Sequence, residues 1–383
     1  MKDLFVSYSY ELIETPTFEY LDVFTAGDGT YQDVHLYKWL NRQGEIVALR
    51  SDMTKAIARV VASKKNHEAM PKRYAYVASS FRYSERYQGK VHEFTQAGIE
   101  LVGVSVIEAD IEVIQLGIEA LKASGLEDFT IHMGSAKFLK ALLEDIGIEG
   151  IQKEELYRTI EKKDAVKLEE LLRKAKVELV LIEAVVTLIQ SVGGMDLLET
   201  VRQMPLSLAT LSALEELEFL YKWFEAKGLA SYLLFDFSIL SYASYYTGVM
   251  FQGYTQGIGE AILEGGRYDQ LLSNFGVDMA AVGLGINVAL LLQKLEMEGK
   301  LIEPARTLIV CTPFTRDIAY EIAGQFRKDG LIVEQSMLPT LEASIDYAER
   351  VGIQGLIYFK NNEDVDLYHL GERTIQTVKI ASL

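Results

Sequence analysis

Strand-like and helical patterns of apolar residues follow one another from the start of the chain. Residues 30–50 read as two strands around the turn sequence Asn-Arg-Gln-Gly. Residues 53–64 instead place Ile57, Val60 and Val61 on one apolar side of a helix. The pattern therefore predicts a hairpin followed by an amphipathic helix.

A second hairpin is predicted further along, from strand patterns at 73–85 and 91–103 that are joined by a long polar loop. A helix at 106–123 and a strand at 128–134 follow it. Antiparallel hairpins separated by a helix are typical of an α+β domain rather than of repeated βαβ units. We therefore expect an α+β core.

The middle of the chain is almost continuously helical in pattern. From residue 139 to about 228, Leu recurs with Glu and Lys at three-to-four spacing, interrupted at Gly193, Gly194 and Pro205. The core pattern then resumes as two strands, a turn and a helix, at residues 232–240, 245–255, 264–271 and 286–298. We interpret the helical block as an insertion into the core.

The end of the chain has a different organisation. Pro304 and Ala305 suggest a linker, after which strands and helices alternate at 307–313, 317–330, 331–336, 341–352 and 356–361. This alternation predicts a small, largely parallel α/β domain. The expected domains are residues 1–303, with the insertion at about 139–228, and residues 304–383.

Length, charge and composition narrow the class of protein. A chain of 383 residues is long enough for two or three domains. Its net charge of −17 argues against nucleic acid as the main partner, because phosphates are bound chiefly by Lys and Arg. We see neither a signal peptide nor an apolar run that could cross a bilayer, so we expect a cytoplasmic protein. The single cysteine, Cys311, and the five histidines show no metal-site spacing.

Polar residues that could share a pocket fall in two stretches of the core. Asp52 and Thr54 are two positions apart, and Gln96 and Glu100 are four apart on a predicted strand, so each pair can point to one side. Two carboxylates, an amide and a hydroxyl suit an amino acid, and Arg82 could pair with its carboxylate. On spacing alone, the simpler interpretation is that these residues cap helices and line a solvated sheet edge.

Several stretches, in order along the chain, resemble the histidyl-tRNA synthetases, which have the class II aminoacyl-tRNA synthetase fold. FRYSERYQGKVHEFTQAGIELVG resembles that family's motif 2 hairpin, and LRSDMT resembles its LRPEGT segment. SYYTGVMFQ and GGRYD resemble two histidine-specific signatures, and AVGLGINVALLL stands where motif 3 belongs. The resemblance covers residues 14–103 and 233–296 and implies an antiparallel sheet core of the class II type.

The same resemblance implies a pocket for free L-histidine. The matched positions are Asp52, Thr54 and Gln96 for the α-amino group, Arg82 for the carboxylate, and Glu100, Tyr246 and Tyr268 for the imidazole, with Tyr245 beside them. A carboxylate and phenolic hydroxyls can satisfy both ring nitrogens. A wrong ligand that left one buried polar group unpaired would lose about 1–3 kcal/mol, so selectivity for histidine is expected.

Positions that carry cations in the synthetases differ in this chain. Ser241 stands where the family's RGLDYY sequence has its arginine, Leu290 stands where motif 3 has an ATP-binding arginine, and Lys90 replaces an arginine of the hairpin. Amino-acid activation needs preorganised cations to stabilise the charge that develops on the transferred phosphate. We therefore expect a protein without catalytic residues, cofactor or metal.

The chain thus keeps the residues of the histidine pocket but lacks the arginines of the synthetases. In this it resembles a paralogous family, the regulatory subunits of short-form ATP phosphoribosyltransferase. In that family the synthetase-like protein has no aminoacylation activity and assembles with a small catalytic subunit into a hetero-oligomer. The complex makes phosphoribosyl-ATP in the first step of histidine biosynthesis, and histidine inhibits it. The resemblance implies that this chain binds the catalytic subunit and mediates its activation and feedback inhibition. The alternative is a divergent histidyl-tRNA synthetase.

Two further expectations concern assembly. The C-terminal domain resembles a shortened anticodon-binding domain, but from Arg306 onward it has 8 Lys and Arg against 11 Asp and Glu, which favours subunit contact over tRNA binding. The apolar stretch ETPTFEYLDVF falls where class II synthetases form their dimer interface. We therefore expect a homodimer within the larger assembly.

Overall fold

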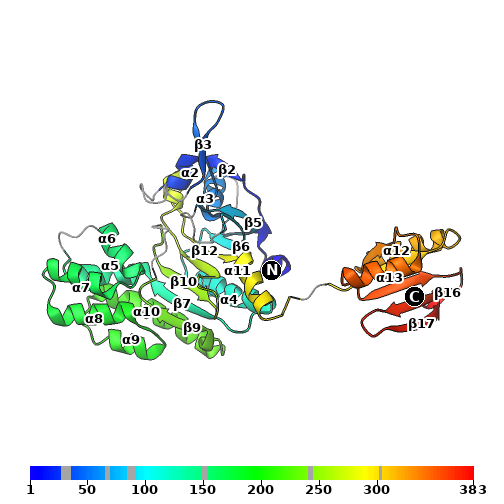
Figure 1. The fold of residues 1–383 in the computed structure, drawn as a ribbon. Helices are drawn as coiled ribbons and strands as arrows, with labels where there is room; N and C mark the ends of the chain where they lie inside the picture. Colours follow the sequence, from blue (N-terminus) through cyan, green and yellow to red (C-terminus); the bar gives the residue numbers. More distant parts are fainter. Residues whose placement is uncertain (27–35, 65–69, 84–90, 149–152, 240–244, 302–303) are drawn as a thin grey trace. The chain divides into compact units, whose positions relative to one another are not determined.

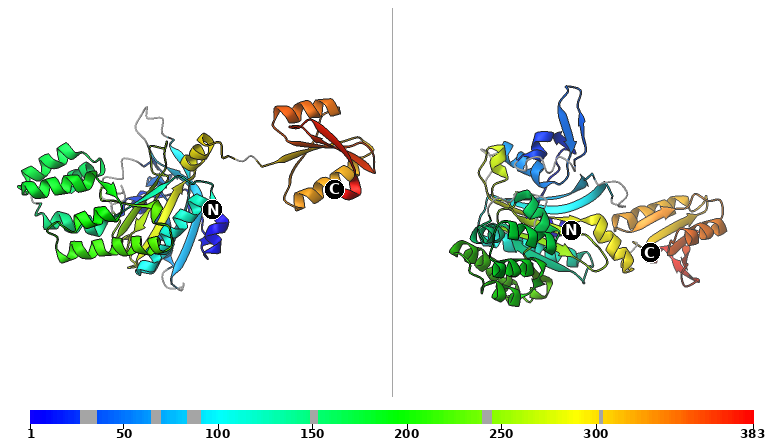
Figure 2. Two further views of the ribbon diagram at one scale, coloured as in Figure 1. Left: turned by 90° about the horizontal axis from the view of Figure 1, so that it is seen from below. Right: turned by 60° about the vertical axis from the view of Figure 1, so that its left-hand side comes forward.

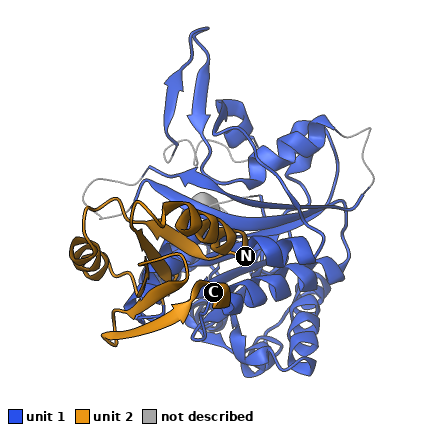
Figure 3. Cartoon of the chain, turned by 90° about the vertical axis from the view of Figure 1, so that its right-hand side faces the viewer, with its two compact units in different colours: residues 1–300 blue, residues 301–383 orange. Residues whose placement is uncertain are grey.

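The computed structural model divides the chain into two compact units, Met1–Lys300 (unit 1) and Leu301–Leu383 (unit 2), which Figure 3 shows in separate colours. The structure describes the whole chain except residues 27–35, 65–69, 84–90, 149–152, 240–244 and 302–303. Among the described residues, no helix is both long and apolar enough to cross a membrane.

Unit 1 is built on a nine-stranded sheet (Figures 1 and 2). In spatial order its strands are β1 (Glu11–Leu12), β5 (Lys72–Phe81), β6 (Glu93–Val102), β12 (Ala281–Asn287), β11 (Leu263–Arg267), β10 (Val249–Tyr254), β7 (Thr130–Ser135), β9 (Leu233–Asp236) and β8 (Val192–Gly193). Neighbouring strands are antiparallel except for the pairs β1–β5 and β7–β9. The predicted second hairpin is confirmed as β5 and β6.

The two faces of this sheet differ because successive side chains on a strand point to opposite faces. One face carries buried apolar residues such as Ile99 and Leu284, and it packs against the helices α4 (Ile107–Ala123) and α11 (Val288–Met297). The other face follows the paired positions Glu100, Gly283, Gly266 and Met250 across β6, β12, β11 and β10. This second, glycine-rich face carries the predicted pocket residues.

A smaller sheet lies near the start of the chain, in the order β2 (Phe18–Tyr20), β4 (Ile46–Leu49) and β3 (Lys38–Leu40). Strands β3 and β4 confirm the first predicted hairpin. Residues 30–35, which that prediction includes, lie outside the described part of the chain. The helices α2 (Leu21–Thr25) and α3 (Thr54–Ser63) complete this region, whereas α1 (Lys2–Ser7) packs against β5 of the large sheet.

The apolar side of α3 is rotated from the predicted one. Ile57 and Val61 are buried, but Val60 is only half-buried, and Ala58 and Ala62 take its place. The helix buries its 57–58–61–62 side, and Val60 falls on the flank.

The predicted helical block is a group of helices, drawn green in Figure 1 beside β7 and β9. They are α5 (Ala136–Asp145), α6 (Lys153–Glu161), α7 (Ala165–Lys174), α8 (Leu179–Gln190), α9 (Met195–Val201) and α10 (Leu208–Ala226). Side-chain caps begin three of them: the N–H groups of Phe138, Lys167 and Thr210 donate to Ser135, Asp164 and Ser207. The interruption at Gly193 is the short edge strand β8, which the sequence pattern did not predict.

The turn predicted at residues 264–271 is wrong for the first half of that stretch. Leu263–Arg267 is the strand β11, in the middle of the sheet, and a short 3₁₀ helix follows at Leu272–Phe275. Two adjacent glycines suggested a turn, but Gly265 and Gly266 serve close packing. A Cβ on Gly265 would lie 2.5 Å from the ring of Phe251 and from the carbonyl oxygen of Gly283.

Unit 2 is a five-stranded sheet with two helices, and the predicted strand and helix alternation is confirmed. In spatial order the strands are β14 (Ile332–Gln335), β13 (Arg306–Cys311), β15 (Gly355–Phe359), β16 (Asp364–His369) and β17 (Thr374–Lys379), with α12 (Arg316–Lys328) and α13 (Leu341–Arg350). The first three strands are parallel, and β16 and β17 add an antiparallel hairpin that was not predicted. Short 3₁₀ helices at Ala230–Tyr232 and Ile380–Ser382 complete the described elements.

Candidate functional site

Separate segments of unit 1 bring the eight predicted pocket residues to the glycine-rich face of the large sheet. Asp52 and Thr54 lie at the start of α3, Arg82 follows β5, Gln96 and Glu100 lie on β6, Tyr245 and Tyr246 precede β10, and Tyr268 follows β11. Segments from residue 52 to residue 268 therefore meet at one place.

Glu100 lies at the centre of this arrangement and is only 1% exposed. Thr54 Oγ1 donates to its Oε1 atom at 2.6 Å, and the hydroxyl of Tyr268 donates to its Oε2 atom. Burial raises the pKa of Glu100 to about 8; the two hydrogen bonds lower it and the carboxylate of Asp52 raises it further. This carboxyl therefore exchanges its proton close to neutral pH.

Glycines on β12 make the room that these side chains occupy. A Cβ on Gly283, which pairs with Glu100, would lie 1.8 Å from Glu100 Oε2. A Cβ on Gly285 would lie 2.2 Å from Gln96 Nε2. Since no larger residue fits at either position without displacing a pocket side chain, the two glycines shape the pocket.

Three tyrosines lie beside Glu100, and two of them, Tyr245 and Tyr268, share an apolar cluster with residues of α3. The ring centroids of Tyr245 and Tyr246 are 4.9 Å apart, and those of Tyr245 and Tyr268 are 5.6 Å apart. Burial, followed by the nearby Glu100 carboxyl, raises the pKa of Tyr268, so its hydroxyl stays a proton donor. The Tyr246 ring packs over the backbone of Gly266, where an added Cβ would meet it at 2.8 Å.

Arg82 lies at the rim, with a side chain that is 47% exposed. Its Nε atom donates to the carbonyl oxygen of Ser51 at 3.3 Å, and its Nη1 atom is 3.9 Å from Glu264 Oε2. The guanidinium also lies over the ring of Phe94, 5.2 Å from its centroid. These long contacts leave the guanidinium able to reach a carboxylate at the rim.

The simpler interpretation, in which the polar residues serve local structure, holds in part. Asp52 Oδ1 accepts the backbone N–H of Lys55 at 3.3 Å in the first turn of α3. Gln96 Oε1 accepts from Ser80 Oγ at 3.5 Å. Ser51 Oγ also donates to Asp52 Oδ2 at 3.3 Å. All these contacts are long, so Asp52 and Gln96 keep further hydrogen-bonding capacity.

The sequence reasoning missed Tyr76 on β5. Its side chain is 1% exposed, and its hydroxyl donates to the carbonyl oxygen of Leu284 at 3.5 Å. Burial and then Glu100 raise its pKa, which places the phenol beside the pocket. Tyr76 pairs with Gly98 on the neighbouring strand, and a Cβ added to Gly98 would lie 2.4 Å from the Tyr76 hydroxyl. A glycine beside a tyrosine on paired strands indicates close contact, and this pairing is the signal that could have identified Tyr76.

The GGRYD signature also contains a residue with a different role. Arg267 points to the other face of the sheet, is 4% exposed, and donates to both carboxylate oxygens of Asp110 on α4. Its Nη1 atom also donates to Asp269 Oδ1 at 3.2 Å. Arg267 therefore holds α4 on the sheet, whereas Tyr268 next to it faces the pocket.

Of the three positions where the synthetases have an arginine and this chain does not, the structure describes one. Leu290 lies on α11, half-buried against the main apolar core, and its N–H donates to Asn287 Oδ1 at 3.2 Å. Ser241 and Lys90 lie outside the described residues. Within the described ranges, no three His, Cys, Asp or Glu side chains come together as a metal site would require.

Comparisons with known proteins first define the class. The family model described as Histidyl-tRNA synthetase matches residues 1–291. The solved histidyl-tRNA synthetase from Nostoc sp. superposes with a TM-score of 0.83, covering 99% of this chain and 91% of that chain, at 22% identity. The predicted α+β fold of the class II synthetase type is thereby confirmed, and the chain belongs to a histidyl-tRNA synthetase-like class.

Two more similar proteins narrow this class. The ATP phosphoribosyltransferase regulatory subunit of Acetivibrio thermocellus is 34% identical over 100% of this chain and 92% of its own length. The crystal structure of "an ATP phosphoribosyltransferase regulatory subunit/histidyl-tRNA synthetase" from Bacillus halodurans is 33% identical, with a TM-score of 0.80, covering 93% of this chain and 91% of that chain. The chain belongs to the family of ATP phosphoribosyltransferase regulatory subunits.

Proposed function

We propose that this chain is a non-catalytic, histidine-responsive regulatory subunit. It binds a separate catalytic subunit that makes phosphoribosyl-ATP from ATP and phosphoribosyl pyrophosphate, supports its activity, and inhibits it when histidine occupies the pocket. The names of the relatives support the regulatory role. The observation that carries the histidine assignment is the buried Glu100 carboxyl, held between Thr54 and Tyr268.

The pocket offers a partner for each polar group of histidine. Glu100 and a tyrosine hydroxyl face a ring with two nitrogens, one a donor and one an acceptor in the neutral form. Asp52, Gln96 and the Thr54 hydroxyl supply acceptors for an ammonium group, and Arg82 supplies donors for a carboxylate. The glycine-rich sheet face gives the flat surface on which such a ligand can lie.

The same geometry argues against amino-acid activation by this chain. The leucine at position 290 packs against the core and offers no charge to a nucleotide phosphate, which activation requires. We expect the purified chain to catalyse no histidine-dependent exchange of pyrophosphate into ATP. Exchange above the level of an unrelated control protein would establish the alternative, a divergent histidyl-tRNA synthetase.

Histidine can alter the activity of a partner only through a difference in affinity. By linkage, the ligand must bind the inhibited assembly more tightly than the active one, and the ratio of the two affinities limits the inhibition. Substitutions in the pocket should therefore shift the histidine dependence without reducing the activity measured in the absence of histidine.

Two variants test the pocket in a mixture of the two subunits. Glu100→Gln replaces one acceptor oxygen by an amide nitrogen, and Tyr268→Phe removes a hydroxyl. Each change should raise the histidine concentration for half-inhibition by up to about tenfold, since a hydrogen bond contributes about 0.5–1.5 kcal/mol and a factor of ten corresponds to about 1.4 kcal/mol. Tyr232→Phe is the matched control, because this half-buried tyrosine stacks on Phe129 outside the pocket. Inhibition that stays unchanged in both pocket variants would reject the assignment.

A further inference from the structure

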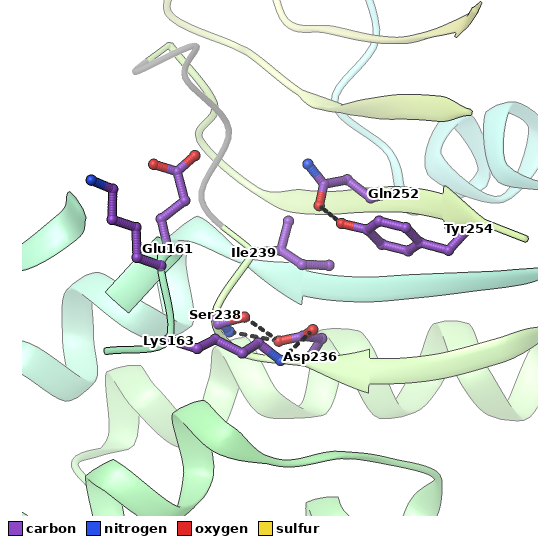
Figure 4. Close-up of a pocket in the computed structure, with 8 residues that line it drawn as sticks. Glu161, Lys163, Asp236, Ser238, Ile239, Gln252 and Tyr254 are labelled. Carbon is purple, nitrogen blue, oxygen red and sulfur yellow. Dashed lines mark hydrogen bonds and ion pairs between the residues drawn. The ribbon is translucent and has the colours of Figure 1, made fainter. Parts of the chain in front are cut away.

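A second cavity, of about 350 Å³, lies where the helical insertion meets the large sheet. Figure 4 shows Glu161 and Lys163 on one side of it, Gln252 and Tyr254 on the other, and Ile239 between them. The lining residues are Glu161, Lys162, Lys163, Asp236, Ser238, Ile239, Gln252 and Tyr254. The loop between α6 and α7 thus faces β9 and β10 across this space.

This cavity is distinct from the pocket around Glu100, although it lies on the same face of the sheet. None of the eight predicted pocket residues lines it. Gln252 on β10 is three strands away from Glu100 on β6, which corresponds to about 14 Å at the usual strand spacing. The cavity and the Glu100 pocket therefore occupy different positions on the same face of the sheet.

Of the two acidic residues that line this cavity, Asp236 is already paired with groups of the protein. Asp236 accepts the backbone N–H of Ser238 at 2.9 Å, its hydroxyl at 2.5 Å and Lys163 Nζ at 2.9 Å. Burial alone would raise the pKa of Asp236, but hydrogen bonds from Ser238 and Lys163, and the His132 ring with its Nδ1 atom 3.5 Å from Asp236 Oδ2, lower it to about 2. An entering ligand consequently meets a carboxylate whose charge is compensated.

The lysines, by contrast, keep unused donors. Within the described part of the chain, the Lys162 side chain has no hydrogen bond or ion pair, and Lys163 Nζ bonds only to Asp236. An ammonium group carries three N–H donors, so these two residues offer several to a ligand. Across the cavity, the Tyr254 hydroxyl donates to Gln252 Oε1 at 2.7 Å, which leaves its oxygen free to accept.

We propose that this cavity is a second ligand site, for a small organic anion that carries a phosphate or carboxylate group together with hydroxyl groups. Lys162 and Lys163 hold the acidic group, because their ammonium groups supply charge-assisted donors. The hydroxyls of the ligand donate to the oxygens of Tyr254 and Ser238. The site depends neither on histidine binding nor on the identity of the catalytic partner.

Glu161 decides how such a site responds to pH. Burial and then the carboxylate of Glu264 raise its pKa to about 7, while Lys162 and Arg158 lower it. Its ionised form repels an anion and its protonated form can donate to one, so affinity for the anion falls as pH rises through about 7. Glu161→Gln should bind the anion at least as tightly as the wild type and lose this pH dependence.

Calorimetric titration of the full chain tests the proposal, first with histidine present to saturate the Glu100 pocket and then with histidine omitted. Glycerol 3-phosphate and glycerate are the phosphate and carboxylate probes. We expect saturable binding of at least one, weakened by about tenfold in Lys162→Gln, since a lost charge-assisted hydrogen bond has that effect. Lys162 is exposed, so this variant should fold, and the exposed Lys174→Gln on α7 is a matched control that should bind like the wild type.

Four results would overturn the proposal. They are the absence of saturable heat with both probes, an equal loss of affinity in Lys162→Gln and Lys174→Gln, binding that appears only when histidine is omitted, and saturable binding of ethanolamine in place of the anions. The third result would move the anion to the Glu100 pocket, and the fourth would make the cavity an amine site centred on Glu161.

Discussion

A single buried carboxyl sets the chemistry of the main pocket. Glu100 accepts hydrogen bonds from two donors, Thr54 and Tyr268, and the carboxylate of Asp52 lies close by. Burying a carboxylate without a cation is costly, so the protein holds this group in a form that readily keeps its proton. If the pocket binds histidine as we propose, a positive or hydrogen-donating group of the ligand offsets this cost, and Glu100 then responds to occupancy of the pocket.

The stability of unit 1 should report this titration directly. In the unfolded chain Glu100 ionises above 4.5, whereas in the folded chain it keeps its proton up to about 8. Between these values the folded state binds one proton more, so the free energy of unfolding falls as pH rises, by at most about 1.4 kcal/mol per pH unit. Urea unfolding without histidine, followed by the fluorescence of Trp39 and Trp223, measures this in unit 1.

Glu100→Gln is the control for this titration, because it keeps the size of the side chain and one acceptor oxygen but cannot ionise. Its free energy of unfolding should lack this fall, and the difference between the two proteins should level off below the ordinary pKa and above about 8. Parallel pH profiles would mean that Glu100 titrates at its ordinary value and would contradict the account of the pocket given above.

At the scale of elements, the register between β6 and β12 defines the pocket. Glu100 pairs with Gly283, and Gln96 pairs with Asn287, two positions along from Gly285. Side chains from β6 lie over the bare backbone of β12. A shift of one residue in the register would turn one strand over relative to the other, so the glycines of β12 would no longer lie beside the polar side chains of β6. Strand pairing and pocket shape therefore depend on the same two glycines.

Gly283→Ala tests this dependence. The added methyl group cannot coexist with the Glu100 side chain in its present position, since the gap is 1.8 Å, and overpacking of this kind costs about 1–3 kcal/mol. We expect calorimetry to show a loss of histidine binding, and urea unfolding to show reduced stability. Gly259→Ala is the control, because nothing lies within 4 Å of its added methyl group. Normal histidine binding by Gly283→Ala would refute the proposed pocket shape.

Much of this arrangement could be predicted from local patterns, and the failures have physical reasons. The hairpin of β5 and β6 has long apolar alternation, and its polar positions stand out against it. The sequence pattern predicts a turn at β11, because the adjacent glycines Gly265 and Gly266 are as typical of a turn as of close packing between strands. Tyr76 was missed because only its pairing with Gly98 distinguishes it from other tyrosines of β5. Both misses concern contacts between strands, which one strand's own pattern does not contain.

At the scale of the whole molecule, unit 1 leaves an apolar surface uncovered on its small sheet. Phe18 and Tyr20 on β2 and Trp39 on β3 are 52%, 54% and 42% exposed. The ring centroids of Phe18 and Trp39 are 5.5 Å apart, and pairing through β4 puts Tyr20 in line with Trp39. Contiguous exposed aromatic residues of this kind mark protein contacts. Phe18 and Tyr20 lie within the stretch predicted as a dimer interface, so we predict that this surface contacts a second copy of the chain.

Phe18→Asp should therefore dissociate a homodimer into single chains, because a carboxylate buried between two aromatic surfaces would lack a partner. Light scattering of the purified protein measures the mass, and circular dichroism checks that the variant is folded. Leu208→Asp on α10 is the control, since Leu208 is 86% exposed and lies far along the chain from the small sheet. If the wild type has the mass of one chain, or if both variants keep the mass of two, the aromatic surface does not pair the subunits. Dissociation by Phe18→Asp alone would place the homodimer contact on the small sheet, away from both ligand sites on the large one.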